Sequence, residues 1–423
     1  MQVLWGIGGM AFILLLAFLL STNRRAINPR TVLGALAIQV TFGIIVLYWE
    51  AGKRVLQAVS EGVQAVINSS EEGIDFVFGP VLPDEGVVFA FQVLPVIIFF
   101  AALTSVLYHW NVLQWVVTLI GGALQKLLRT SQAESMSATA NIFVGQTEAP
   151  LVVRPYIDRM TSSELFAVMT GGLSTVAGSV LVGYALLGAS LEYLIAASFM
   201  AAPAGLLMAK MVMPETERPV TLDRGATEVV SDAEKEGTEE AEVEAENPLH
   251  HRNVIDAAAA GASDGLRLAL NVGAMLIAFI SLIALVNLIL TSVGGLVGVE
   301  GLTFQLILGY IFAPVMFIIG VPWNEAIDAG SFLGQKLILN EFVAFSNFGP
   351  QAGEFSQKTA AIITFALTGF ANLGSLAILL GGLGGIAPSR RSQIAQFGIR
   401  AVLAGTLANL MSAAIAGILI GGS

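Results

Sequence analysis

The chain of 423 residues is 55% hydrophobic and only 12% charged, against roughly 25% charged residues in a typical soluble protein. It has no cysteine, which excludes disulfides, thiolate metal sites and cysteine nucleophiles, and its three histidines argue against a histidine-based metal site. Low charge together with 45 glycines is typical of a protein solvated by lipid, because small residues let membrane helices approach closely.

Eight apolar segments are long enough to cross the hydrocarbon core of a bilayer, which takes roughly 20 residues. They are residues 3–20, 31–49, 86–110, 164–188, 191–213, 266–290, 359–380 and 394–420. Glycine and polar residues interrupt the last two. The first segment is expected to be a retained helix, since Arg24, Arg25 and Arg30 follow it instead of preceding it as in a signal peptide.

Other segments mix apolar and polar residues in ways that do not fit a simple span. Residues 51–78 place charged side chains within an apolar pattern, as an interfacial helix does. Residues 111–129 and 302–321 are helix candidates, and each leads into a polar segment marked by Gly and Pro. These polar segments, hairpin 1 (131–157) and hairpin 2 (323–348), are too broken to cross lipid alone. We predict two re-entrant hairpins buried in protein.

Positive charge predicts the orientation of the chain. If the arginines after the first span lie in the cytoplasm, the N-terminus is outside, and eight spans return the C-terminus to the same side. The formal net charge of −11 is local, because residues 215–246 hold twelve acids and three bases. Residues 215–252 are therefore expected to form an acidic, solvated cytoplasmic linker.

One order of elements occurs twice, over residues 111–214 and 302–423: a helix, a polar hairpin, a glycine-broken helix and a final helix. The sequences FAVMTG at Phe166 and FALTG at Phe365 open the two broken helices. An odd number of crossings between equivalent points orients the copies oppositely. Inverted repeats with interrupted helices place the substrate site of secondary transporters near the membrane midplane. Residues 1–110 and 253–301 are then expected to form a scaffold.

Hairpin 1 carries Gln146, Thr147 and Glu148 between Gly145 and Pro150. This polar run would be costly in lipid without partners. An amide, a hydroxyl and a carboxylate together can bind the amide-like edge of a nucleobase. A surface loop is the alternative, and the apolar flanks on both sides argue against it.

Hairpin 2 carries Asn340 and Glu341 in apolar surroundings. An ionised Glu341 there needs a counter-charge, a cation or several hydroxyl donors, and the vicinal hydroxyls of a ribose suit it. Lys336 is an alternative structural partner, although five residues is not the usual helical spacing for a pair.

The broken helices add further polar groups. In the second, Phe370 can stack on a base while Asn372 and Ser375 bond a sugar, although such residues also serve as contacts between membrane helices. In the first, Thr175 and Val176 offer a hydroxyl and freed carbonyls. Together with Asn141 and the Val144 carbonyl, they could form an all-oxygen site for Na⁺, made by Asn141, Val144, Thr175 and Val176. Uncharged oxygen cages suit a monovalent ion where unwound helices meet.

Other chemistries find little support in the sequence. It contains no Walker loop, no HExxH motif and no clustered carboxylates for a two-metal site, which disfavours an ATP-driven pump. An intramembrane enzyme using a glutamate as general base lacks a metal or nucleophile beside it. We expect a protein that is not an enzyme, with no cofactor beyond a coupling ion and no nucleic-acid partner.

Three motifs in order, GQTEAPLVVRPYI from Gly145, LNEFVAF from Leu339 and FANLGS from Phe370, resemble the concentrative nucleoside transporter family in its bacterial form. The resemblance implies eight spans, two hairpins, a homotrimer in the bacterial cytoplasmic membrane, and elevator-like Na⁺-coupled uptake of uridine-like nucleosides. It implies a set of base contacts, a set of ribose contacts and a Na⁺ site. These are Gln146, Thr147, Glu148, Val180 and Phe370 for the base; Glu341, Asn372 and Ser375 for ribose; and Asn141, Val144, Thr175 and Val176 for Na⁺.

Three positions depart from the usual pattern of that family. Thr175 stands where Ser is common, Phe345 where Tyr is frequent, and Gly374 where Ser is frequent. The first keeps its hydroxyl, whereas Gly374 removes one beside the expected ribose contacts, which can shift selectivity. Two alternatives stay open: some bacterial members use H⁺, and a nucleoside-binding gate or channel without active transport would share the same motifs.

Overall fold

The computed structural model describes residues 2–82, 88–222, 251–296 and 301–421, and every regular element in these ranges is helical. Seven described spans are long and apolar enough to cross a membrane. They comprise α1 (Gln2–Leu20), α2 (Pro29–Gly43, with a π-helical continuation Ile44–Tyr48), α5 (Leu94–His109, preceded by a π-helical turn Phe89–Val93), the pair α9 (Ser162–Ser174) and α10 (Gly178–Leu186), α11 (Leu191–Val212), α13 (Val254–Leu296) and α19 (Arg391–Gly421). The predicted all-α polytopic membrane protein is confirmed.

The remaining predicted span, residues 359–380, is not one helix. It is divided into α17 (Gln357–Leu367) and α18 (Leu373–Ile386). The division follows from Asn372, whose side chain accepts a hydrogen bond from Ser375 N at 2.7 Å and so starts a new helix. Two further helices, α14 (Phe304–Ile318) and α15 (Trp323–Ile338), are together long and apolar enough to count as an eighth span. They are bent by 116° relative to each other.

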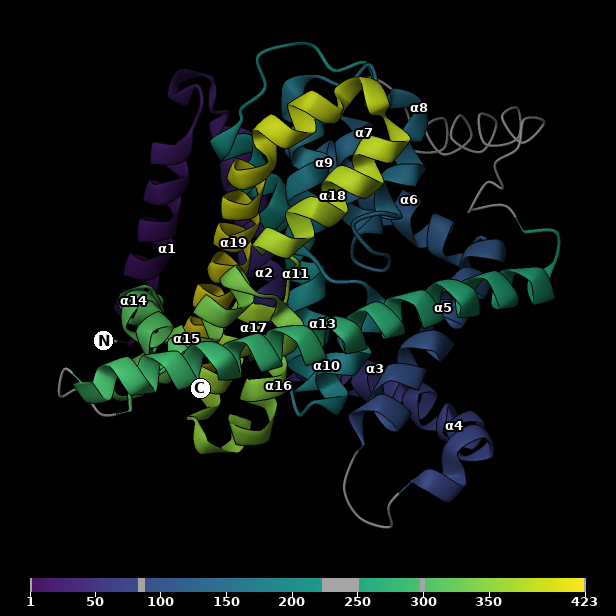
Figure 1. Ribbon diagram of the computed structural model, residues 1–423. Coiled ribbons are helices and arrows are strands. Elements are labelled where there is room, and N and C mark those ends of the chain that lie inside the picture. The colour runs from purple at the N-terminus through teal and green to yellow at the C-terminus, as the bar shows by residue number, and fades with distance from the viewer. Residues whose placement is uncertain (1, 83–87, 223–250, 297–300, 422–423) are drawn as a thin grey trace.

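The repeated order of elements is present in the structure. The first copy contains α6 (Val112–Leu128), α7 (Gln132–Ala140), a 3₁₀ turn (Ala149–Val153) with α8 (Arg154–Ile157), then α9, α10 and α11; the second contains α14, α15, α16 (Glu341–Phe348), α17, α18 and α19. In Figure 1 the chain descends from α9 to α10 and rises from α17 to α18, so the copies run in opposite directions. Hairpin 2 is the α15–α16 pair, and hairpin 1 is α7 with the turns that follow it.

Residues predicted to form an interfacial helix give two amphipathic helices, α3 (Glu50–Ser69) and α4 (Glu71–Phe78). The buried positions of α3, among them Leu56, Ser60 and Ile67, recur at intervals of four and seven residues on one face. In the linker, residues 223–250 lie outside the described residues. Its beginning is bonded to hairpin 1, since Thr221 O accepts from Gln132 N at 3.3 Å.

The helix α13 is longer than the predicted segment of 266–290. Its 43 residues span roughly 65 Å at 1.5 Å per residue, about twice the hydrocarbon thickness, and its axis is crosswise to those of α1 and α19 in Figure 1. It packs along α5, and a Cβ atom at Gly265 would stand 2.7 Å from Ile98 Cα. Glycine therefore permits the close approach of these two helices.

Burial separates a central body from peripheral helices. Within an apolar window of 18 residues, 94% of residues are buried in the α9–α10 span and in α11, whereas the share is 17% in both the α5 span and α13. The helices α9, α11, α17 and α19 pack on one another. Hairpin 1 and the first broken helix thus lie inside protein, which is the surrounding that interrupted backbone at membrane depth requires.

Candidate substrate and cation site

The breaks of the two broken helices meet. The first break (residues 175–177) separates α9 from α10, and the second break (368–372) separates α17 from α18. Phe370 N donates to Thr175 O at 3.1 Å. From α19, Asn409 Nδ2 donates to Ser174 O and to Thr368 O, each at 2.7 Å. These bonds satisfy carbonyls that the interrupted helices leave free.

Hairpin 1 packs against the first break. Gly178 N donates to Phe143 O at 3.1 Å. Val144 follows Phe143 and Val176 lies two residues before Gly178, so the two valines belong to segments that are held together. Both valines are buried. The four residues expected to bind Na⁺ therefore come from adjoining segments.

Asn141 is the C-cap residue of α7, and its side chain faces α9. Its Nδ2 donates to Ser137 O at 2.8 Å, and its Oδ1 is buried with no hydrogen-bond partner among the described residues. A Cβ atom at Gly172 would lie 3.6 Å from this oxygen. Thr175 Oγ1 donates to Gly171 O at 2.9 Å, which leaves its lone pairs available. The arrangement offers uncharged oxygen acceptors beside an interrupted helix.

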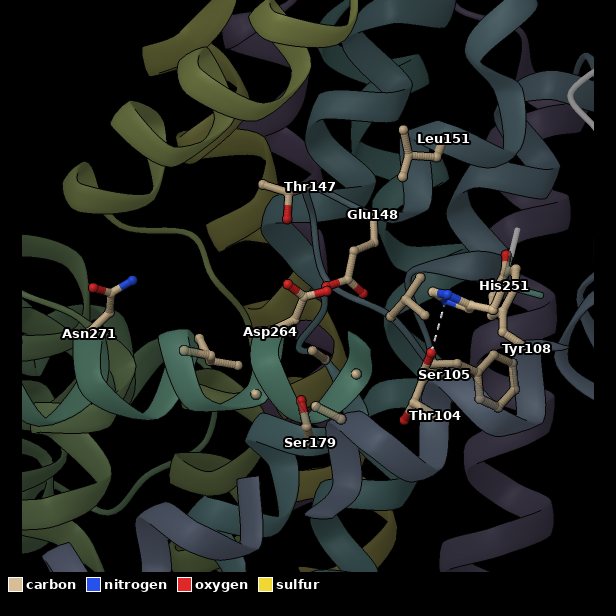
Figure 2. A pocket seen from close by; sticks show the side chains of 17 residues that line it. Thr104, Ser105, Tyr108, Thr147, Glu148, Leu151, Ser179, His251, Asp264 and Asn271 are labelled. Atoms are coloured by element: carbon tan, nitrogen blue, oxygen red, sulfur yellow. Dashed lines mark hydrogen bonds between the residues drawn. The ribbon is translucent and has the colours of Figure 1, made fainter. Parts of the chain in front are cut away.

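Two of the predicted base contacts, Thr147 and Glu148, line a cavity of about 420 Å³ between hairpin 1, α5 and α13. That volume lies within the range of small-molecule sites. Glu148 accepts a hydrogen bond from Gly145 N at 3.4 Å and points toward Asp264 of α13 in Figure 2. Gln146 does not line this cavity. It packs on α9, with its Oε1 buried and without a partner in the described part of the chain.

Residues that the sequence analysis did not select form the opposite wall of the cavity. They come from the scaffold helices and from the residues before α13: Thr104, Ser105, Tyr108, His251, Asp264 and Asn271. Ser105 Oγ and His251 Nε2 are 3.2 Å apart (Figure 2). A signal for α13 does exist in the sequence, since Asp264 and Asn271 are seven residues apart on one face of an apolar helix.

The expected ribose contacts are joined by direct hydrogen bonds. Glu341 is buried; its Oε1 accepts from Tyr184 Oη at 3.0 Å and its Oε2 accepts from Asn372 Nδ2 at 2.8 Å. Asn372 Oδ1 in turn accepts from Ser375 N. Tyr184 was not predicted. Its ring stacks on Phe345 with centroids 4.4 Å apart. Because this contact holds the ring in place, the Tyr184 hydroxyl can orient the Glu341 carboxylate.

The two remaining expected base contacts differ in exposure. Val180 is buried in the first turn of α10, and Phe370 is partly buried in the second break. Neither these two residues nor the Glu341 cluster lines the cavity of Figure 2. The predicted substrate residues thus include two groups: Thr147 and Glu148 line the cavity, and Glu341, Asn372 and Ser375 are bonded together in hairpin 2 and α18.

Lys336 and Glu341 bind different partners, so the alternative of a direct structural pair is not realised. Lys336 Nζ donates to Ala366 O at 2.7 Å and to Asn409 Oδ1 at 2.8 Å. At the base of hairpin 1, by contrast, a buried ion pair does form: Lys210 Nζ lies 2.5 Å from Glu134 and 3.6 Å from Glu215 at the start of the linker.

Three family models match the chain in succession. They are described as Na⁺ dependent nucleoside transporter N-terminus over residues 8–81, nucleoside recognition over 90–191, and Na⁺ dependent nucleoside transporter C-terminus over 193–417. The matches cover nearly the whole chain, with hairpin 1 in the second and hairpin 2 in the third.

Named relatives agree with these matches. The chain is 58% identical to an uncharacterized transporter, YutK, of Bacillus subtilis over 99% of this chain and 100% of that protein. It is 49% identical to the nucleoside permease NupC of Helicobacter pylori over 99% and 98%. It is 39% identical to the rat sodium/nucleoside cotransporter 1 over 97% of this chain and 63% of that protein. These relatives are transporters and not enzymes.

A solved structure of CNTnw in an inward-facing substrate-bound state superposes with a TM-score of 0.91 at 52% identity, covering 100% of this chain and 99% of that one. A variant of the same protein in an outward-facing state gives a TM-score of 0.92 at 53% identity over 100% and 99%. Sequence and fold agree over the full length. The chain belongs to the Na⁺ dependent nucleoside transporter family.

Proposed function

We propose that this protein is a secondary active transporter that takes up uridine-like nucleosides together with Na⁺. The observation that carries the proposal is the meeting of the two breaks, beside an amide oxygen of Asn141 that has no partner among the described residues and beside the Glu341 cluster. An ion and a nucleoside bound at these places would share one set of interrupted helices, which is the arrangement that coupling requires.

The base is proposed to bind at hairpin 1. Thr147 and Glu148 supply a hydroxyl and a carboxylate on the cavity wall, and Gln146 supplies an amide oxygen that has no partner in the described residues. Val180 and Phe370 would contact the faces of the base.

The ribose is proposed to bind at the Glu341 cluster with Asn372 and Ser375. Each carboxylate oxygen can accept more than one hydrogen bond, so ribose hydroxyls can bind while Tyr184 and Asn372 hold the carboxylate in place. The Ser375 hydroxyl lies in the first turn of α18, one turn from the Asn372 amide.

The coupling ion is proposed to be Na⁺, held by Asn141, Val144, Thr175 and Val176. An amide oxygen, a hydroxyl and backbone carbonyls do not take up a proton near neutral pH, whereas they are suitable ligands for a hard monovalent cation. H⁺ coupling would have to use a carboxylate such as Glu148 or Glu341, and this is the alternative that the transport assay tests.

The movement is proposed to be elevator-like. The hairpins and broken helices would move as one body against a scaffold that includes α5 and α13, and the cavity of Figure 2 lies where these two parts face each other. The protein is proposed to be a homotrimer in the bacterial cytoplasmic membrane, with both termini outside and the acidic linker inside.

The test is uptake of radiolabelled uridine by purified protein in liposomes. Accumulation above the external concentration under an inward Na⁺ gradient, but not under an inward H⁺ gradient alone, is expected. Accumulation driven by H⁺ alone would replace Na⁺ by H⁺ in the proposal. Downhill flux without accumulation under either gradient would identify a nucleoside-binding channel, and no flux of any nucleoside would overturn the proposal.

A further inference from the structure

Asp264 is a carboxylate on the scaffold helix α13, and it faces the tip of hairpin 1. It lines the cavity of Figure 2, where its side chain and that of Glu148 point toward each other from opposite walls. Neither the proposed Na⁺ site nor the proposed base contacts include Asp264. A ligand bound at Glu148 therefore meets a second carboxylate on the far wall of the cavity.

Close packing of α13 on α5 fixes the direction of Asp264. A Cβ atom at Gly261 would stand 2.6 Å from Ala101 O, and one at Gly265 would stand 2.7 Å from Ile98 Cα, so both glycines face α5. Asp264 directly precedes Gly265 and lies about 100° around the helix from it. The same packing that joins the two scaffold helices therefore directs the Asp264 side chain past α5 and into the cavity.

The two facing carboxylates have few partners. Glu148 accepts a hydrogen bond from Gly145 N at 3.4 Å, and in the described part of the chain Asp264 has no hydrogen-bond or ion-pair partner. Among the described residues that line the cavity, only His251 is basic, and its Nε2 lies 3.2 Å from Ser105 Oγ (Figure 2). Ionised carboxylates only accept hydrogen bonds. The space between them therefore favours a ligand that brings hydrogen-bond donors.

Nucleobases differ in the group that they would present to this space. Cytosine and adenine carry an exocyclic amino group with two N–H donors, whereas uracil and hypoxanthine carry a carbonyl oxygen at the same ring position. An amino group can donate one N–H to each of two carboxylates. A carbonyl oxygen would bring a third acceptor to the same place and leave all three without a donor, which disfavours binding.

We propose that Asp264 is a specificity-determining residue, which makes the protein prefer nucleosides with an exocyclic amino group: cytidine over uridine, and adenosine over inosine. Glu148 and Asp264 each accept one N–H of that amino group, while the ribose binds at the Glu341 cluster. The inference rests on the proposed binding of nucleosides in this cavity. It narrows the substrate class, because uridine is carried but its amino counterpart binds more tightly.

The test measures the affinity of the purified protein in detergent for three pyrimidine ribosides that differ at one ring position. Cytidine has an amino group there, uridine an oxygen, and the riboside of pyrimidin-2-one a hydrogen atom. Each competes with radiolabelled uridine at saturating Na⁺, so that the proposed coupling ion does not limit binding. Adenosine and inosine form a second pair with the same difference. In parallel, the slope of log uridine affinity against log Na⁺ concentration counts the Na⁺ ions taken up with the nucleoside.

The wild type is expected to bind cytidine at least about fivefold more tightly than uridine, with the pyrimidin-2-one riboside in between. Asp264→Asn should reduce this ratio to about twofold or less, because an amide offers the base a donor as well as an acceptor. The change keeps the size of an exposed side chain, so the variant should fold. Asp256→Asn, at an exposed position on the same helix but off the cavity, is the matched control and should keep the wild-type ratio.

Equal affinity of the wild type for cytidine and uridine would overturn the inference and leave nucleoside transport intact. An Asp264→Asn protein that keeps the wild-type ratio would also overturn it, and a changed Na⁺ slope in that protein would point to a cation held between the carboxylates instead. If Asp264→Asn does not fold, the wild-type order of the three pyrimidine ribosides decides: cytidine tightest and uridine weakest supports the inference, and any other order overturns it. A wild type that binds no nucleoside would overturn the proposed function, and the inference with it.

Discussion

Hairpin 2 bonds its polar side chains to one another and to neighbouring helices, whereas hairpin 1 leaves several polar atoms without a partner. In hairpin 2, Glu341, Lys336 and Asn340 all have hydrogen-bond partners. In hairpin 1, Gln146 Oε1, Asn141 Oδ1 and Ser137 Oγ are buried without one among the described residues. Each such atom costs about 1–3 kcal/mol.

The difference indicates that ligand binding recovers more free energy at hairpin 1 than at hairpin 2. A folded protein rarely keeps several buried polar atoms unsatisfied without a functional reason. Ligands that supply a cation and hydrogen-bond donors to hairpin 1 would recover that cost, whereas hairpin 2 is organised in advance. We therefore expect substitutions in hairpin 2 to abolish a preformed site, and substitutions in hairpin 1 to weaken ligand affinity in a graded way.

The largest effect is expected from Glu341→Gln. The change keeps the shape of the side chain but removes the charge that accepts from Tyr184 and Asn372. Since hydrogen bonds to charged groups contribute about 1.5–3 kcal/mol each, uridine uptake efficiency should fall on the order of 100-fold. Initial rates of uptake over a range of uridine concentrations measure this. Glu354→Gln, at an exposed position, is the control, and wild-type uptake by Glu341→Gln would assign Glu341 a structural role only.

Asn141→Ala tests the proposed cation site at hairpin 1. Removing the amide oxygen, which has no partner in the described part of the chain, should raise the Na⁺ concentration for half-maximal uptake by about 10- to 100-fold, the equivalent of one lost ligand, with a much smaller change at saturating Na⁺. The exposed Asn68 gives the control Asn68→Ala. A Na⁺ dependence that stays as in the wild type would contradict the proposed cation site and favour H⁺ coupling.

Much of this candidate site could be predicted from the sequence. A polar residue between apolar flanks is costly in lipid, so it is expected inside the protein, next to polar partners or a ligand. Asn141, Glu341 and Asn372 were selected for that reason, and the structure places them at or beside the breaks. The two breaks themselves followed from Gly, Ser and Asn within otherwise apolar helices. Local composition is enough to identify such positions.

What escaped prediction depends on packing between distant segments. Tyr184 reads as one more aromatic core residue, and only its place opposite Glu341, 157 positions along the chain, makes it part of the site. Asp264 lies in a scaffold helix, and which face of α13 meets hairpin 1 follows from the crossing of that helix over the central body (Figure 1). Sequence periodicity does not determine that crossing.

Tyr184→Phe asks whether the organisation of hairpin 2 matters beyond its charge. The ring stacked on Phe345 stays, and one hydrogen bond to Glu341 is lost. A loss of about 1 kcal/mol corresponds to roughly a fivefold rise in KM for uridine, with the Na⁺ dependence unchanged. A change in Na⁺ dependence as large as that of Asn141→Ala would contradict the separation of the two hairpins.

The smallest effect is expected at the base of hairpin 1, beside the ion pair of Lys210 and Glu134. Glu215 is partly exposed, lies 3.6 Å from Lys210 and accepts a hydrogen bond from Thr161 Oγ1 at 2.8 Å. Partly exposed ion pairs contribute about 0–1 kcal/mol, so Glu215→Gln should lower the thermal unfolding temperature in detergent by a few degrees at most.

Glu134 in the same network is buried. Glu134→Gln should lower the unfolding temperature more than Glu215→Gln does, because it leaves Lys210 without its nearest charge. Neither variant should alter the slope of uridine affinity against Na⁺ concentration, since Asn141 and Gln146 lie beyond the other end of α7; a changed slope would mean that the base and the tip of hairpin 1 act as one unit.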